Sequence, residues 1–92
     1  PMTIDREALN DEFRSEIEKL LRSGMPDLVV EGYMKAKVRT LADRHSAEQW
    51  RDLRAYVDEV GEQAHQGDPV KKARVDHFND MFIAELKKRQ GV

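Results

Sequence analysis

The chain has 92 residues, which is enough for one domain but not for two. It contains no cysteine, so a disulfide framework, cysteine-ligated zinc, iron–sulfur ligation and thiol nucleophiles are excluded. Charged residues make up 37% of the sequence, yet the formal net charge is −2, which is unlike a generally basic nucleic-acid-binding protein. We therefore interpret residues 1–92 as a single domain.

Neither a membrane span nor a signal peptide is predicted. The longest apolar run, residues 81–84, is far too short to cross a bilayer, and the first residues carry acids in place of an apolar segment. Pro1 before Met2 is interpreted as a cloning remnant, with Met2 as the natural start. We expect a cytoplasmic protein, and the absence of cysteine fits a reducing compartment.

The first predicted helix covers residues 5–23, with Asp5 as its N-cap and Ser23-Gly24 as its end. Its apolar residues recur every three or four positions: Leu9, Phe13, Ile17, Leu20 and Leu21. The second predicted helix covers residues 27–44 and begins at Asp27 as its N-cap. Its apolar stripe contains Val30, Tyr33, Met34, Val38 and Leu41.

The third predicted helix covers residues 46–66 and opens on a capping box formed by Ser46 and Gln49. Its stripe is the most regular in the chain: Trp50, Leu53, Val57, Val60 and Ala64. The fourth covers residues 68–90, with Asp68 as N-cap and Pro69 at the first helical position. Its stripe contains Val75, Phe78, Met81, Phe82 and Leu86, and Gly91 closes it.

These elements predict an all-α fold, a compact four-helix bundle, either complete by itself or completed by homodimerisation. No segment has the alternating pattern of a strand, and short links favour antiparallel neighbours. A rearranged packing is the main alternative. Alternatively, the second and third helices merge across residues 44–46 into a longer hairpin that dimerises.

Catalytic motifs are not found. The five glycines are scattered singly and form no phosphate-binding loop. Ser23 and Ser46 are better explained as helix-end residues than as nucleophiles. We therefore expect a non-enzymatic protein without a cofactor.

One spacing is compatible with a metal site. Glu62 and His65 form a Glu-x-x-His step, which puts both side chains on one helix face as in the carboxylate sites of di-iron bundles. Such sites need two steps and further carboxylates, which a homodimer with Glu31 could supply. However, Glu62 points away from the apolar stripe of its helix, so an exposed acid and an exposed histidine are the favoured interpretation.

The alternative function is nucleic-acid binding through the basic residues of segment 35–54, which holds six bases against three acids. Residues 41–53 resemble the helix-turn-helix of DNA-binding proteins. The turn is short and lacks glycine, and Glu48 and Asp52 would repel phosphates. An ordinary corner between two helices is the favoured interpretation.

The leading hypothesis is a small protein-interaction module, acting as a regulator, an inhibitor or an adaptor, and itself a homodimer. Two observations support it. The second and fourth helices carry more apolar surface than a single buried stripe requires, and Gly32 lies on an outer face where another backbone could approach. Lys37 falls inside a stripe, where it either extends to water or pairs with an acid such as Glu85 or Glu16. The predicted partner-binding residues are Val29, Tyr33, Lys37, Phe82 and Ile83.

Overall fold

Four α-helices hold most of the residues that the structure, a computed structural model, describes: 3–22 and 24–91. They are α1 (Arg6–Leu21), α2 (Asp27–Arg44), α3 (Trp50–His65) and α4 (Pro69–Gln90). No strand occurs in these ranges, so the predicted all-α four-helix fold is confirmed. Pro1, interpreted above as a cloning remnant, and Ser23, expected at the end of the first helix, lie outside the described residues.

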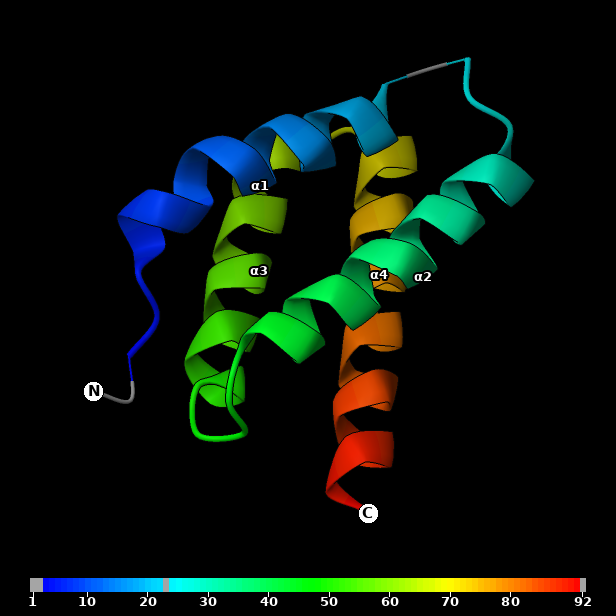
Figure 1. Cartoon of the computed structure of the whole chain (residues 1–92). Coiled ribbons are helices and arrows are strands. Elements are labelled where there is room, and N and C mark those ends of the chain that lie inside the picture. The colour runs from blue at the N-terminus through cyan, green and yellow to red at the C-terminus, as the bar shows by residue number, and fades with distance from the viewer. Residues whose placement is uncertain (1–2, 23, 92) are drawn as a thin grey trace.

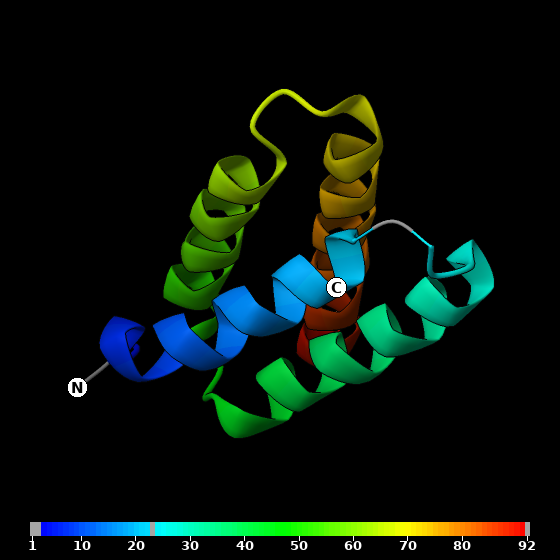
Figure 2. The ribbon, with the colours of Figure 1, turned by 90° about the horizontal axis from the view of Figure 1, so that it is seen from above.

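The helices form two crossing layers. α3 and α4 are adjacent and antiparallel, while α1 and α2 run obliquely across them (Figures 1 and 2). α1 packs mainly on α3, α2 packs mainly on α4, and α4 contacts all three other helices. Because α2 ends at Arg44 and α3 begins only at Trp50, the alternative of one continuous helix through residues 44–46 is wrong.

Aromatic rings from three helices fill the centre. Phe13, Phe78 and Phe82 are fully buried, and the Phe13 ring centroid lies 6.2 Å from that of Phe78 and 5.8 Å from that of Tyr56. No polar or charged residue of the described ranges is buried. Tyr33, which spacing places in the stripe of α2, is instead exposed. None of the described helices combines the length and apolarity needed to cross a membrane.

Two of the predicted N-caps are confirmed. Asp5 accepts a hydrogen bond from the Ala8 N–H at 3.0 Å, and Asp68 accepts from the first turn of α4, where Pro69 occupies the first position. Asp27 as a cap is wrong. It is the first residue of α2 behind Pro26, and its carboxylate binds α4.

The predicted start of α3 is also wrong, by four residues. Only half of the capping box forms, because Gln49 Oε1 accepts the Ser46 N–H at 2.9 Å while residues 47–49 make a turn. Side chains close the corner between α2 and α3: His45 Nδ1 donates to the Leu41 carbonyl, and the Trp50 indole N–H lies 3.2 Å from the Ala42 and His45 carbonyls. These bonds satisfy carbonyls that a helix end leaves open.

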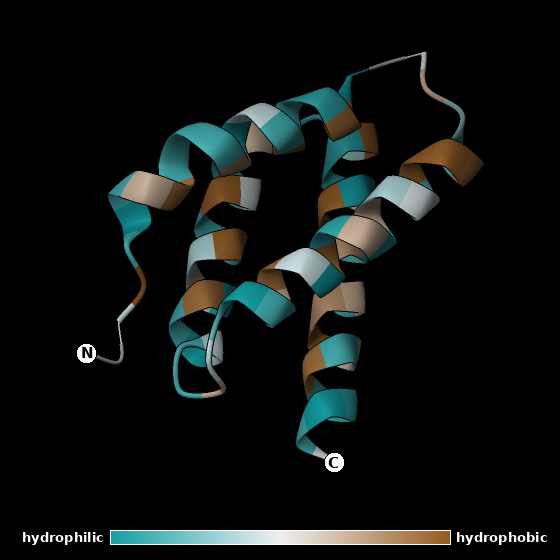
Figure 3. Cartoon of the chain, in the orientation of Figure 1, coloured by the Kyte–Doolittle hydropathy of each residue, from teal (hydrophilic) through white to brown (hydrophobic). Residues whose placement is uncertain are grey.

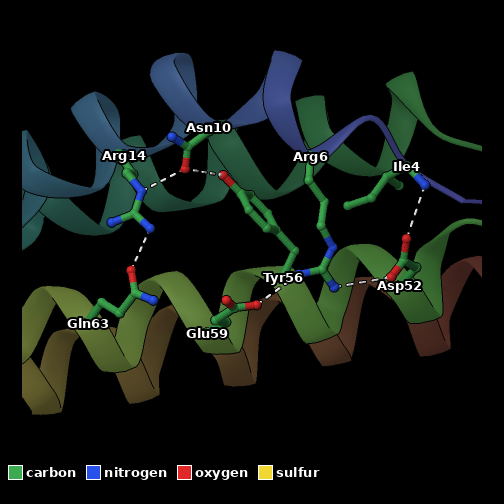
Figure 4. Close-up of polar contacts among 8 residues, drawn as sticks. All are labelled: Ile4, Arg6, Asn10, Arg14, Asp52, Tyr56, Glu59 and Gln63. Atoms are coloured by element: carbon green, nitrogen blue, oxygen red, sulfur yellow. Dashed lines mark hydrogen bonds and ion pairs between the residues drawn. The ribbon is translucent and has the colours of Figure 1, made fainter.

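A row of polar contacts attaches α1 to α3 (Figure 4). The Ile4 N–H donates to Asp52 at 3.0 Å, and Arg6 reaches both Asp52 and Glu59 while its guanidinium lies over the Tyr56 ring. The backbone hydrogen bond from Ile4 lowers the pKa of the Asp52 carboxyl, with a further contribution from Arg6. The remaining residues of the row are Asn10, Arg14 and Gln63.

Two glycines within helices have opposite surroundings. A Cβ on Gly61 would lie 2.5 Å from Val75 Cγ1, so α3 and α4 approach closely there only because the side chain is missing. A Cβ on Gly32 would meet nothing within 4 Å. Close backbone approach within the domain is therefore a property of Gly61.

We predict that Gly61→Ala lowers the free energy of unfolding by about 1–3 kcal/mol, because the buried and rotamerically restricted Val75 must shift. The matched change Gly32→Ala should raise it by about 0.5–1 kcal/mol, since alanine is the better helix former in open space. Urea denaturation at low micromolar protein concentration measures both. Equal effects of the two changes would contradict this packing.

Candidate functional site

The exposed large hydrophobic side chains of the described residues gather at one end of two helices. Leu28, Val29 and Tyr33 lie in the first two turns of α2, and Val70 lies in the first turn of α4. Leu28 is 85% exposed and Val70 is 65% exposed. Figure 3 shows the strongly hydrophobic first turn of α2 at the upper right, away from the core.

A groove of about 430 Å³ runs between the N-terminal halves of α2 and α4. Aliphatic side chains form most of its lining, and four polar residues flank them. It is lined by Asp27, Val30, Glu31, Met34, Pro69, Val70, Ala73, Arg74 and His77. Its size and composition are those of a site for apolar groups.

Arg74 holds the groove in place. Its guanidinium donates to the carbonyl oxygens of Leu20, Arg22 and Met25, at 3.1, 3.3 and 3.3 Å, and to Asp27 Oδ1 at 3.1 Å. Its side chain is 16% exposed, so these bonds are partly shielded from water. One α4 side chain thus fixes the end of α1, the connection and the start of α2.

A second polar link lies one turn further along. His77 Nε2 contacts Glu31 Oε2, and Glu31 Oε1 lies 4.0 Å from Lys35 Nζ. Both carboxylate oxygens of Glu31 are therefore engaged. The Asp27 side chain is 95% exposed, and only its Oδ1 is hydrogen-bonded, so it keeps a free acceptor at the rim.

The predicted partner-binding residues do not form one surface. Val29 and Tyr33 are one turn apart on a shared, exposed flank of α2. That flank is about 200° around the helix from Asp27 and Glu31, which line the groove. Lys37 has a side chain only 15% exposed and forms an ion pair with Glu12 of α1 at 3.4 Å.

The two predicted residues of α4 lie elsewhere. Phe82 is in the core and 1% exposed, so it supports the helix from within and presents nothing to a partner. Ile83 is half-buried on the flank that faces α3, where the preceding turn places Asn79 2.7 Å from Asp58. The oblique crossing of α2 and α4 thus separates Ile83 from Val29 and Tyr33.

The Glu62 and His65 side chains contact each other at the end of α3, where His65 also binds the backbone. The Gly67 N–H donates to His65 Nδ1 at 3.2 Å, which puts the ring proton on Nε2, where it is shared with Glu62 Oε2 at 3.1 Å. Both ring nitrogens are therefore engaged. Across residues 3–22 and 24–91, no group of three or more His, Asp or Glu side chains is arranged to hold a metal ion.

Half of the six basic residues of segment 35–54 pair with acids. Lys37 and Arg44 both bind Glu12, whose pKa is lowered by the hydrogen bond from Arg44 first and by the charge of Lys37 next. Lys35 pairs with Glu31. This neutralisation leaves the segment less basic than its composition indicates.

Comparison with models of protein families, with curated proteins and with solved structures finds no match to this chain. Its own residues therefore carry the functional argument.

None of the nine residues that line the groove was predicted to bind a partner. Arg74 lies four residues before Phe78 and hence on nearly the same helix face, a position in which a partly buried cation needs acceptors. That signal was present in the sequence. The identity of the acceptors was not, because they are backbone carbonyls at the end of another helix.

We predict that Arg74→Lys lowers the free energy of unfolding by about 2–3 kcal/mol, because an ammonium cannot serve several carbonyls and a carboxylate as the planar guanidinium does. Asp27→Asn, which removes only the exposed partner, should give a much smaller loss. Urea denaturation of both variants measures the difference. Similar losses would mean that Arg74 acts only through its surface ion pair.

Proposed function

We propose that this chain is a small, non-enzymatic protein-interaction module, acting as a regulator, an inhibitor or an adaptor in the cytoplasm, and that it works as a homodimer. Its binding surface is the exposed flank of α2 that carries Val29 and Tyr33, with Leu28 beside it. The observation that carries the proposal is the exposure of Leu28, Val29 and Tyr33 in the first two turns of α2. Contiguous exposed apolar surface on a small domain usually marks an interface.

The energetics favour a protein partner. Covering one such aliphatic side chain completely contributes about 1.5–3 kcal/mol, and Tyr33 has the amphipathic ring that is enriched at binding hot spots. The surface is held rigid by Arg74, so little ordering free energy is lost on binding. A partner with an apolar helical face fits the exposed flank of α2.

Site-specific photocrosslinking in cells tests the proposal. We predict that p-benzoylphenylalanine at Tyr33, a larger aromatic side chain at an exposed position, forms one dominant protein adduct. The same group at Ala55, exposed on α3, is the matched control and should give none. Gel mobility and mass spectrometry identify the adduct.

Adduct formation that is equally weak or equally dispersed at positions 33 and 55 would contradict a binding role for α2. The mass of the adduct also separates the partners, because a second copy of the chain adds 10.7 kDa.

A further inference from the structure

A second groove lies between α2 and α4, towards the C-terminal ends of both helices. Its volume is about 240 Å³. Val38, Met81 and Ala84 form the apolar part of its lining. Bases surround them from both helices, and we call this hollow the basic groove; its bases are Lys35, Arg39 and Lys88.

The bases of the groove have few acidic partners. Of the three, only Lys35 forms an ion pair in the described chain, with Glu31 at 4.0 Å. The one acid in the lining, Glu85, is 19% exposed and is bound by Arg89, which also binds Asp43 at 2.6 Å. The groove therefore faces solvent with an excess of positive charge.

This placement of charge is unfavourable when no anion is present. Lys35 and Arg39 are four residues apart on α2, and like charges at that spacing weaken a helix. The helix dipole accounts for Lys88, which lies in the last turn of α4, but its effect does not extend to the middle of α2. An anion in the groove would relieve the repulsion among all three bases.

The apolar part of the lining narrows the class of anion. A phosphate backbone needs cations but no apolar surface, and the lining offers no aromatic ring on which a nucleobase could stack. The volume is smaller than the about 300–1,000 Å³ of most small-molecule pockets, so it suits one apolar side chain. Met81 is half-buried, and its flexible thioether adapts to the shape of a neighbour. These features favour an acidic polypeptide.

We propose that the basic groove binds an acidic helix of a partner protein, which packs one apolar side chain against Met81 and Ala84. Lys35 and Arg39 are separated by about 6 Å along the axis of α2. Two carboxylates four residues apart on the partner helix have the same separation, so each meets one base. Lys88 binds a third carboxylate from the side of α4.

The basic groove is separate from the exposed flank of α2 that carries Val29 and Tyr33. Lys35 and Arg39 lie about 120° around the helix from that flank. The inference therefore goes beyond the proposed function, and the Tyr33 photocrosslink and the experiment below fail independently of each other.

A designed peptide tests the inference. The probe is an alanine-based peptide of about 16 residues, long enough to be helical, with glutamates four residues apart around one leucine and a neutral fluorophore. Fluorescence anisotropy with the full chain at low salt should show saturable binding that weakens as salt is added. A control peptide with glutamine in place of every glutamate should bind at least about tenfold more weakly.

Charge reversal locates the site. Arg39→Glu and Lys88→Glu should each weaken binding of the glutamate peptide about tenfold or more. Arg54→Glu is the matched control, because Arg54 is an exposed base on α3 and its reversal changes the net charge by the same amount. It should leave the affinity within about twofold. Circular dichroism checks that all three variants keep their helices.

The methyl resonance of Met81 reports on the apolar contact. The leucine peptide should shift it, whereas a peptide with alanine in place of leucine should bind more weakly and leave it nearly unmoved. NMR of the chain labelled at its methionine methyl groups measures both.

An equal loss of affinity in Arg54→Glu overturns the inference, because binding then follows net charge alone. So does a glutamate peptide that fails to bind at about 1 mM, or a Met81 methyl that the leucine peptide leaves unmoved. Single-stranded and duplex DNA oligonucleotides are the remaining probes. If they bind more tightly than the peptide and lose affinity in Arg39→Glu and Lys88→Glu, the groove is a phosphate site and the acidic helix is the wrong partner.

Discussion

The structure depends on one guanidinium. Arg74, from the second turn of α4, donates to three backbone carbonyls at the end of α1 and in the following connection, and to the first side chain of α2. The end of a helix leaves carbonyl groups without partners, and shielding such groups from water without a donor is costly. Because the donor comes from α4, satisfying those groups also fixes where α2 starts on α4.

That constraint shapes the proposed binding surface. α2 lies obliquely on α4, and the wedge between their N-terminal halves is the groove. The inner side of α2 is filled by Val30, Met34 and Val38, so Leu28, Val29 and Tyr33 have no place in the core. Hydrophobic side chains on a rigid frame lose little conformational entropy when a partner covers them. More of the free energy gained by burial therefore contributes to binding.

The sequence predicts the helices well because their signals are local. Asp5 and Asp68 cap the helices that follow them, and the stripe of α3 packs on or in the core as its period requires. Interhelical features were not predictable in the same way. Tyr56 enters the core from beside the α3 stripe, Lys37 turns to Glu12, and Ile83 faces α3, because each depends on a crossing angle that no local pattern encodes.

Gly32 and Gly61 illustrate the same limit. A glycine within a helix signals close approach of another backbone, and Gly32 is the one that stands out on an outer face. The approach within the domain occurs at Gly61, against Val75. Gly32 instead lies on the exposed side of α2, where a Cβ would meet nothing within 4 Å.

Native-state amide hydrogen exchange of the Arg74→Met variant, followed by NMR, tests the central claim most directly. If Arg74 fixes the connection and the start of α2, protection should fall selectively in residues 24–34 and at the end of α1, while the centres of α3 and α4 keep wild-type protection. Uniform loss of protection throughout the chain, or none at all in residues 24–34, would contradict it.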